Sequence, residues 1–268
     1  MTWMFSRIGC ACLIAALWLT GCAVPVEEDG KAAESAMSNS LLRVGLTANY
    51  PPLIDRVGGE LVGIEIDLAN EVSKGLDKRI EFVEIPWEQL IPALVRGDID
   101  VIMSGMSITA GRKQEISFTE PYLHIGQMAI TRIKEIQKLG SLSALLNAPI
   151  TVGFESGTTG ESFVKTNMHN AKPQAVDSID AAVVALRSRK IDVFIHDAPT
   201  AWRIGSDPAY QDLIGLYWPL TDEYLGWGVR TSDPALRTAL NEQLAVMQKD
   251  GRLPRITRKW IKVRIQVR

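Results

Sequence analysis

The apolar residues of this chain follow two patterns, short continuous runs and stripes at helical spacing. Apolar runs predict buried strands at 42–46, 80–85 and 99–103. Stripes spaced by three or four residues predict helices at 68–76 and 90–95, and Gly97 is a stop signal for the second helix. The order strand, helix, strand, helix, strand predicts right-handed crossovers and a largely parallel sheet.

The same order begins again at residue 149. Strands are predicted at 149–154, 174–176 and 191–195, and helices at 159–165 and 179–186. The remaining signals are a hairpin at Gly58-Gly59, a strand at 226–230, a helix that Asp233-Pro234 begins, and an amphipathic stretch at 253–261.

A short internal repeat links the two units. Ala93-Leu94 with Ile99-Asp100-Val101 recurs as Ala185-Leu186 with Ile191-Asp192-Val193 at a constant offset, and the offset places His196 at the position of Ser104. We therefore expect an α/β fold with two Rossmann-like lobes of similar build.

The N-terminal segment is typical of an export signal rather than of a folded domain. Arg7 precedes an apolar run at 8–19 that is too short to span a bilayer as a stable helix. The run ends in Leu19-Thr20-Gly21-Cys22, which resembles a bacterial lipobox. Residues 1–21 are therefore predicted to be a lipoprotein signal peptide, and Cys22 is predicted to be lipidated. A plain signal peptide cut nearby and a retained anchor are the alternatives.

Residues 22–40 are rich in Ala, Glu and Ser and are predicted to be a flexible tether. The three cysteines, Cys10, Cys12 and Cys22, lie before the tether or at its first residue, so the body of the protein contains no thiol. A disulfide framework and a cysteine nucleophile are therefore excluded for the body.

Composition and charge exclude several other classes of protein. The chain has 268 residues, 46% of them apolar and 22% charged, which suits a packed core. The net charge is −2 and no basic patch is present, which argues against a nucleic-acid partner. The three histidines are scattered, and no phosphate loop or nucleophile elbow occurs, so we expect no metal and no cofactor.

Polar residues gather where the predicted strands end. Ser107 and Thr109 follow the strand at 99–103 and can cap the next turn, whose free backbone N–H groups favour an anion. The planar donor fork of Arg112 fits a carboxylate. An ordinary turn with a solvated arginine is the alternative. The other strand ends are 47–50, Trp87, 155–159 and His196-Asp197, and ligands of open α/β sheets bind beyond such ends.

Several motifs share their order and spacing with one protein family. They are Tyr50-Pro51-Pro52-Leu53, Gly63-Ile64-Glu65-Ile66-Asp67-Leu68, Trp87 with Leu90-Ile91-Pro92-Ala93-Leu94, Ser104 to Arg112, Phe118-Thr119-Glu120-Pro121-Tyr122, Ser156-Gly157-Thr158-Thr159 and His196-Asp197-Ala198-Pro199. In these motifs the chain resembles the type II periplasmic solute-binding proteins for amino acids, family 3 of the bacterial extracellular solute-binding proteins.

The resemblance implies two lobes that close around one ligand by hinge motion. Lobe 1 would comprise residues 41–130 and 223–268, and lobe 2 would be inserted as residues 131–222. The two hinge strands would lie near 128–132 and 220–226.

The resemblance also implies a site for a zwitterion. Arg112 would bind the α-carboxylate with the amides of Thr109, Thr158 and Thr159. Asp197 would accept the α-ammonium with the Ser104 carbonyl and the Ser107 hydroxyl; a helix N-cap is the alternative role of Asp197. The predicted ligand-binding residues are Thr47, Tyr50, Trp87, Ser104, Gly105, Met106, Ser107, Thr109, Arg112, Glu155, Thr158, Thr159 and Asp197.

Four of these residues bear on the ligand side chain. Tyr50 and Trp87 would lie against it, with burial in the core as the alternative. Relatives often carry Asp at the position of Thr47. Glu155 favours a polar or basic side chain over an acidic one, with exposure to water as the alternative.

The function implied is that of an amino-acid-binding lipoprotein, not an enzyme, which delivers its ligand to the permease and ATPase subunits of an ABC importer. We expect an exported monomer held by a lipid anchor in the periplasm or at the cell surface. One alternative is a cyclohexadienyl dehydratase on the same fold, with Glu155, His196 or Glu223 as general acid. A stand-alone ligand sensor is another.

Overall fold

The computed structural model of this protein describes residues 40–261. The predicted signal peptide, Cys22 and residues 22–39 of the predicted tether lie outside the described residues, as do residues 262–268. Between residues 40 and 261, no helix is long and apolar enough to cross a membrane.

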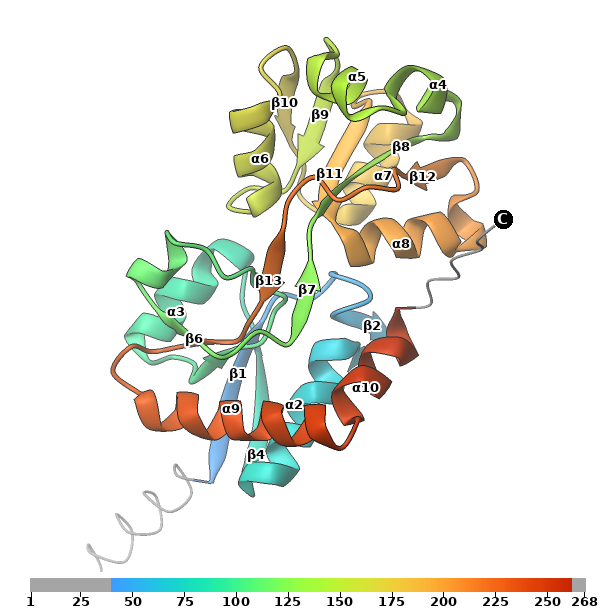
Figure 1. Ribbon diagram of the computed structural model, residues 1–268. Coiled ribbons are helices and arrows are strands. Elements are labelled where there is room, and N and C mark those ends of the chain that lie inside the picture. The colour runs from blue at the N-terminus through green and yellow to red at the C-terminus, as the bar shows by residue number, and fades with distance from the viewer. Residues whose placement is uncertain (1–39, 262–268) are drawn as a thin grey trace, which may run out of the picture. The chain divides into compact units, whose positions relative to one another are not determined.

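Lobe 1 is built on a five-stranded sheet with the strand order β4-β1-β5-β14-β6 (Figure 1). Its strands are β1 (Leu41–Leu46), β4 (Arg79–Glu84), β5 (Val101–Ile102), β6 (Ser117–Phe118) and β14 (Gly228–Val229). β1 runs parallel to β4 and β5, as the strand and helix order predicts, whereas β14 runs antiparallel to β5 and β6. The helices of this lobe are α2 (Ile64–Leu76), α3 (Leu90–Arg96), α9 (Pro234–Lys249) and α10 (Arg252–Trp260), with the short 3₁₀ turns η1 (Trp87–Gln89) and η2 (Arg112–Gln114).

Two local predictions in lobe 1 are confirmed. The strands β2 (Asp55–Val57) and β3 (Glu60–Val62) pair as an antiparallel hairpin around Gly58-Gly59. Both glycines have positive φ, 61° and 90°, which a two-residue hairpin turn of this kind requires. Asp233 caps α9, because its side chain accepts from the Leu236 amide.

Lobe 2 is built on a second five-stranded sheet with the order β10-β9-β11-β8-β12. Its strands are β8 (Gln127–Arg132), β9 (Thr151–Phe154), β10 (Lys172–Ala175), β11 (Val193–Asp197) and β12 (Leu213–Gly215). β9 runs parallel to β10 and β11, and β8 runs antiparallel to β11 and β12. The helices are α4 (Ile136–Leu139), α5 (Leu142–Asn147), α6 (Thr159–Asn167), α7 (Ile179–Arg187) and α8 (Ala198–Ser206), with η3 (Ile133–Glu135) and η4 (Pro208–Tyr210).

An antiparallel strand pair runs between the two sheets. It consists of β7 (Leu123–Ile125) and β13 (Glu223–Leu225) (Figure 1). The expected crossing near 220–226 contains β13. The crossing expected near 128–132 is wrong, because that stretch is β8, which lies between β11 and β12 inside the second sheet. Its apolar side chains are buried there, whereas β7 makes the connection a few residues earlier.

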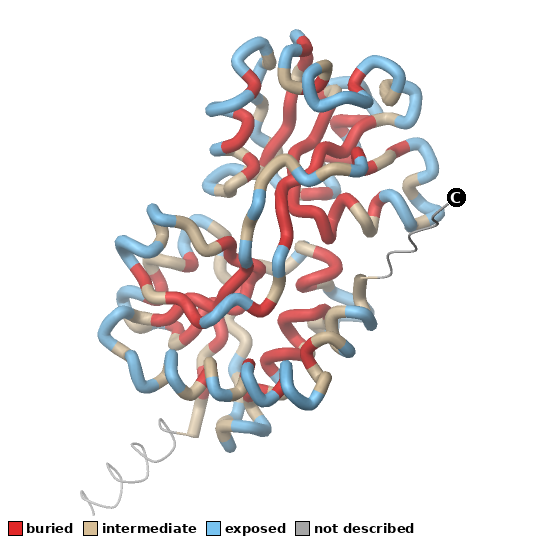
Figure 2. Tube along the Cα trace, in the orientation of Figure 1, coloured by how far each residue is buried: buried red, intermediate tan, exposed pale blue. Residues whose placement is uncertain are grey.

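The cores lie along the central strands and under the helices of both lobes (Figure 2). In lobe 1, Leu68 and Val72 of α2 belong to the same buried cluster as Leu240 and Leu244 of α9. The C-terminal helices therefore pack in lobe 1, although the chain has passed through lobe 2 before reaching them.

The repeated Ile-Asp-Val stretch makes equivalent hydrogen bonds in both lobes. The Asp100 carboxylate accepts from the backbone N–H of Arg43 on β1, at 3.0 Å. The Asp192 carboxylate accepts from the backbone N–H of Thr151 on β9, also at 3.0 Å. Each aspartate thus fixes the start of its strand against the parallel neighbouring strand, β1 or β9.

An arginine at the end of the neighbouring antiparallel strand, or directly after it, completes each arrangement. In lobe 1, Arg230 donates to the Ile99 carbonyl at 2.5 Å and to the Asp100 carboxylate at 3.2 Å. In lobe 2, Arg132 donates to the Ile191 carbonyl and to the Asp192 carboxylate, both at 2.8 Å. The two lobes therefore share a charged anchor at the same place.

A glycine on the parallel neighbouring strand, β1 or β9, lies under the repeated isoleucine in each lobe. A Cβ at Gly45 would lie 2.1 Å from Cδ1 of Ile99, and a Cβ at Gly153 would lie 2.6 Å from Cδ1 of Ile191. The similar build predicted from the repeat is therefore realised in the packing of both sheets.

Candidate functional site

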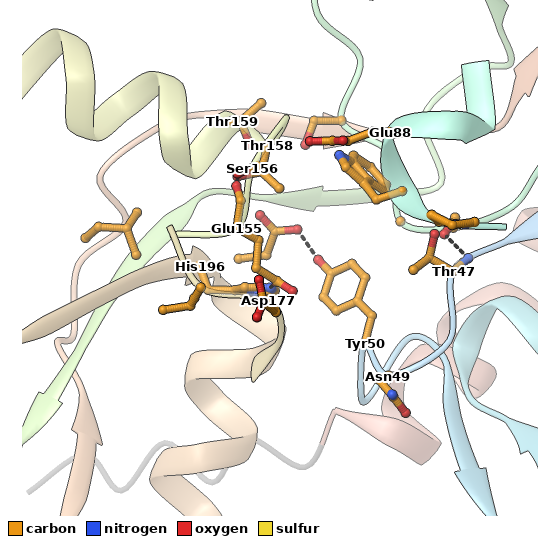
Figure 3. A pocket seen from close by; sticks show the side chains of 18 of the residues that line it. Thr47, Asn49, Tyr50, Glu88, Glu155, Ser156, Thr158, Thr159, Asp177 and His196 are labelled. Atoms are coloured by element: carbon orange, nitrogen blue, oxygen red, sulfur yellow. Dashed lines mark hydrogen bonds and ion pairs between the residues drawn. The ribbon is translucent and has the colours of Figure 1, made fainter. Parts of the chain in front are cut away.

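A cavity of about 510 Å³ lies between the lobes at the carboxyl ends of their parallel strands. Its volume is within the range that small-molecule sites occupy. Figure 3 shows side chains from both lobes facing it. The predicted residues that line it are Thr47, Tyr50, Trp87, Ser104, Gly105, Ser107, Arg112, Glu155, Thr158, Thr159 and Asp197.

Two predicted residues do not line the cavity. Met106 is 2% exposed and belongs to an apolar core cluster of lobe 1. Thr109 lies outside the lining, but its hydroxyl accepts from the Arg112 amide at 3.2 Å. Thr109 therefore shapes the turn that carries Arg112, which agrees with the capping role expected for it.

The Arg112 guanidinium contacts both lobes. One of its terminal nitrogens donates to the Ser107 carbonyl at 2.8 Å, and the other donates to the Gly157 carbonyl of lobe 2 at 3.2 Å. Its Cζ lies 5.1 Å from the centre of the Trp87 ring. Burial lowers the pKa of Arg112 from its usual value, while the charges of Asp197 and Glu223 oppose this change. Within the described residues no carboxylate lies within ion-pair distance of Arg112.

The Gly157 carbonyl is shared by two donors from lobe 1. It accepts from Arg112 and, at 3.1 Å, from the Trp87 indole nitrogen. Gly157 has a φ of 72°, a conformation that glycine adopts without strain. The Gly-containing turn ahead of α6 therefore presents its carbonyl toward lobe 1.

Thr158 begins α6 as its N-cap. Its hydroxyl accepts from the Glu161 amide at 3.2 Å and donates to the Glu155 carbonyl at 2.6 Å. The first amides of a helix have no partner inside the helix, so the N-terminus of α6 carries free donors. These donors belong to the part of lobe 2 that lines the cavity beside Arg112.

Asp197 ends β11 and is buried. One carboxylate oxygen accepts from the Tyr50 hydroxyl of lobe 1, and the other accepts from the side-chain amide nitrogen of Gln127. Asp197 occupies the N-cap position of α8, but its side chain makes no capping hydrogen bond. The N-cap alternative is therefore not supported. Burial raises the pKa of Asp197 above its usual value, the charge of His196 opposes this, and that of Glu223 adds to it.

Gln127 is a lining residue that the sequence did not suggest. Its amide nitrogen donates to Asp197 and, at 2.9 Å, to the Thr159 hydroxyl. In the sheet it lies opposite Asp197, because β8 pairs antiparallel with β11. Only this strand register links the two residues, so spacing along the chain gives no signal for Gln127.

His196 and Glu155 form a pair in the cavity wall. Nε2 of His196 lies 2.8 Å from Oε2 of Glu155, and the two side chains are 9% and 27% exposed. Burial acts to lower the pKa of His196, but the hydrogen bond with Glu155 and the charge of Asp197 raise it above its usual value. Glu155 therefore faces both an imidazole and the cavity rather than water alone.

The corresponding ends of the lobe 1 strands carry neutral groups. The Thr47 amide donates to the Ser104 hydroxyl at 2.9 Å, and the Thr47 hydroxyl donates to the Ile85 carbonyl at 2.8 Å. Gly105 has a φ of 65°, and a Cβ there would lie 2.5 Å from the Tyr50 ring. Tyr50 can therefore reach Asp197 only because this position is glycine.

A buried glutamate supports this turn from below. Glu65 of α2 is 1% exposed and accepts from the Gly105 amide at 2.7 Å, the Tyr122 hydroxyl at 2.7 Å and the Trp227 indole at 3.0 Å. Burial raises the pKa of Glu65 above its usual value, while the donors from Tyr122, Gly105 and Trp227 oppose the rise. Glu65 lies three residues before Leu68, on the same stripe but outside the helix predicted at 68–76, and this spacing is the signal that could have identified it.

Further polar residues line the cavity without having been predicted as binding residues. Apart from Gln127, these are Asn49, Glu88, Ser156, Asp177 and His196, the last expected only as a general acid of the alternative enzyme. Within the described range, no group of three or more His, Cys, Asp and Glu side chains is arranged to hold a metal ion.

Known proteins share both the sequence and the fold. The model of the bacterial extracellular solute-binding proteins, family 3, matches residues 42–263. The ABC transporter glutamine-binding protein GlnH of Bacillus subtilis (strain 168) is 31% identical over 211 residues, which are 76% of this chain and 74% of that protein. The histidine-binding periplasmic protein of Salmonella typhimurium (strain LT2) is 33% identical over 239 residues, 82% of this chain and 86% of that protein.

A solved structure with a similar fold is that of the ancestral amino acid-binding protein AncCDT-1, described as a precursor of cyclohexadienyl dehydratase. It has a TM-score of 0.78 and 32% sequence identity, and the match covers 86% of this chain and 99% of that chain.

Proposed function

Because this chain belongs to the bacterial extracellular solute-binding proteins of family 3, we propose that it binds a free amino acid and delivers it to an ABC importer. The single observation that carries the proposal is that one cavity contains Arg112, a guanidinium without a carboxylate partner among residues 40–261, and Asp197, a buried carboxylate. An amino acid carries the two complementary charges on groups attached to the same carbon atom.

Arg112 binds the ligand α-carboxylate in this proposal. A guanidinium has five N–H donors in a fixed fork, and the contacts with Ser107 and Gly157 leave donors free for a carboxylate. The amides of Thr158 and Thr159 at the start of α6 supply further donors, and the helix N-terminus favours negative charge.

Asp197 binds the α-ammonium. Each of its oxygens already accepts one hydrogen bond, from Tyr50 or from Gln127, but a carboxylate offers about four lone-pair positions. Tyr50 and Gln127 therefore orient the carboxylate and leave it able to accept the ammonium. The Ser104 carbonyl and the Ser107 hydroxyl add acceptors on the lobe 1 side.

The permease and ATPase of the importer are the proposed partners of the bound form. In the same proposal the protein is an exported monomer anchored through Cys22 in the periplasm or at the cell surface. The histidine-binding relative named as periplasmic supports export of this chain. A stand-alone sensor would use the same ligand site and differ only in its membrane partner.

A dehydratase is the second candidate, favoured by the Glu155–His196 pair in the cavity and by the similarity to a dehydratase precursor. Such an enzyme needs a general acid within reach of its substrate. Phenylpyruvate formation from prephenate or arogenate distinguishes it from a binding protein, which releases its ligand unchanged.

The proposed function is tested by ligand binding to the Arg112→Ala variant. A thermal-shift screen of the twenty amino acids first identifies ligands, because a tight ligand raises the apparent stability. Calorimetry on the variant is expected to show affinity reduced by about 100-fold or more, since breaking a buried charge pair costs roughly 3–5 kcal/mol.

The control is Arg96→Ala, because Arg96 pairs with Asp98 at the surface, with side chains 57% and 54% exposed, and does not line the cavity. It should bind like the wild type. The proposal is wrong if Arg112→Ala, folded normally, binds every amino acid of the screen within tenfold of the wild-type affinity.

A further inference from the structure

The lobe 2 wall of the cavity carries an excess of negative charge. Three neighbouring parallel strands, β10, β9 and β11, point their carboxyl ends at the cavity. Asp177 follows β10, Glu155 follows β9 and Asp197 ends β11, and all three line the cavity. Figure 3 shows Glu155, Asp177 and His196 on the same side, across from Thr47.

A zwitterion alone does not balance these charges. Among the described residues that line the cavity, the carboxylates are Glu88, Glu155, Asp177 and Asp197, whereas the lysine and arginine side chains are represented by Arg112 alone. If the ligand carboxylate pairs with Arg112 and its ammonium with Asp197, Glu155 and Asp177 are left on the lobe 2 wall. His196 is the single group there that can offset them.

Glu155 has the geometry of an acceptor for a ligand side chain. Its Oε2 contacts His196, which fixes the direction of the carboxylate, and the side chain is still 27% exposed. His196 is held in turn, because its ring lies 5.1 Å from the Tyr50 ring in an edge-to-face arrangement. The second carboxylate oxygen of Glu155 is therefore presented by a pre-organised group.

Resting on the proposed function, we infer that Glu155 and Asp177 form the side-chain subsite and select an amino acid whose side chain is a cation. A neutral side chain leaves His196 to offset both carboxylates, and an acidic one adds to the repulsion. The Trp87 ring, which also lines the cavity, already lies 5.1 Å from the Arg112 guanidinium, so the selection rests on the two carboxylates.

His196 couples this selection to pH. Its neighbours that carry or can carry a charge are Glu155 from the β9–α6 loop, Asp197 on its own strand, Tyr50 from lobe 1 and Asp177 from the β10–α7 loop. β8 places the apolar Met128 opposite it. A proton on His196 and a cationic ligand compete for the Glu155 carboxylate. Affinity for a cationic ligand is therefore expected to fall as His196 becomes protonated.

The first test compares L-arginine with L-citrulline, its uncharged analogue of nearly equal shape, by calorimetry. Wild-type protein is expected to bind L-arginine at least about 100-fold more tightly. Glu155→Gln should reduce this ratio at least about tenfold, mainly through weaker binding of L-arginine, and Asp177→Asn should reduce it about two- to fivefold because Asp177 is more exposed. Asp180→Asn on α7, outside the cavity lining, is the matched control and should leave the ratio unchanged.

The second test measures L-arginine affinity between about pH 6 and pH 8.5. Wild-type affinity should rise severalfold with pH, whereas His196→Gln should show a flat profile, and L-citrulline should show a flat profile with both proteins. Equal profiles for L-arginine in the two proteins would overturn the coupling.

The outcomes separate the two proposals. If glutamine or another neutral amino acid binds through Arg112 while L-arginine, L-lysine and L-histidine do not, the subsite inference is wrong and the proposed function stands. If no amino acid binds, both are wrong. If Glu155→Gln leaves the arginine to citrulline ratio unchanged, the assignment of Glu155 is wrong whatever the ligand.

Discussion

Two equivalent pairs of residues lie where the central strands of the two lobes end, and they differ in chemistry. In lobe 1 the Thr47 amide donates to the Ser104 hydroxyl at 2.9 Å. In lobe 2 the same positions hold Glu155 and His196, whose side chains lie 2.8 Å apart. One pair is neutral at every ordinary pH, whereas the other can change its charge.

The residues beneath these pairs are alike. Asp100 and Asp192 make the same backbone contact, and Gly45 and Gly153 lie under the same isoleucine. The anchor that shapes each sheet is therefore separate from the strand ends that face the cavity. A lobe of this kind can change its ligand chemistry at the strand ends without rebuilding its sheet.

The largest expected effect comes from removing the shared anchor. Asp192→Ala should lower the free energy of unfolding by about 3 kcal/mol, because it leaves Arg132, whose side chain is 12% exposed, without its closest carboxylate. Asp100→Ala should cost about 2 kcal/mol, because Arg43 and Arg230 are more exposed and water screens them better. Urea unfolding followed by circular dichroism measures both values.

Asp98→Ala is the control for these variants. Its side chain is 54% exposed and pairs with Arg96 at the surface, so the change should stay within about 0.5 kcal/mol. Equal effects at Asp98, Asp100 and Asp192 would remove the argument for a special anchor.

The second-largest loss of stability is expected from replacing Gly45 or Gly153 by alanine. Gly45→Ala should cost about 1–3 kcal/mol and Gly153→Ala somewhat less, because their new Cβ atoms would lie 2.1 Å and 2.6 Å from the Cδ1 atoms of Ile99 and Ile191. Replacing Ile99 by valine removes the Cδ1 atom that a Cβ at position 45 would meet. A double-mutant cycle of Gly45→Ala with Ile99→Val, measured by urea unfolding, should therefore show favourable coupling. Strict additivity would indicate that the clash is relieved elsewhere.

The smallest effect distinguishes the two strand-end pairs by pH. The pKa of His196 is raised above 6.5 in the folded protein, so its stabilising contribution is present below that pH and is lost as pH rises through the folded pKa. The stability advantage of wild type over His196→Gln should therefore shrink from pH 6 to pH 9. Ser104→Ala should cost about 1 kcal/mol at every pH, because no titrating group is lost. Unfolding free energies at several pH values test this, and a constant difference for His196→Gln would contradict it.

Much of the fold could be predicted from the sequence, because strand runs, helical stripes and capping signals are local. The hairpin at Gly58-Gly59, the Asp233 cap and the similarity of the two units are confirmed. The position of the first crossing strand could not be predicted. β7 and β8 are both short extended stretches, and only their partners, β13 for one and β11 for the other, tell them apart.

The candidate site likewise contains residues that could be predicted from the sequence and residues that could not. The residues at the strand ends could be found, since parallel strands bring their carboxyl ends together and such positions can be counted along the chain. Gln127 could not, because it reaches the cavity through antiparallel pairing with Asp197. Met106 could not be separated from its neighbours by counting, because the chain turns at Gly105, whose φ is 65°, and this turn places Met106 in the core while Ser104, Gly105 and Ser107 line the cavity.

The place where the chain enters and leaves lobe 2 has a practical consequence. The backbone N–H of Gln127 donates to the Thr221 hydroxyl at 2.8 Å, and the backbone N–H of Leu220 donates to the backbone carbonyl of Gln127 at 2.7 Å. The two ends of the inserted segment thus meet at its base. Such a module has the geometry for transfer as a single cassette between related receptors, or for expression with its ends joined, without stretching the chain across the gap.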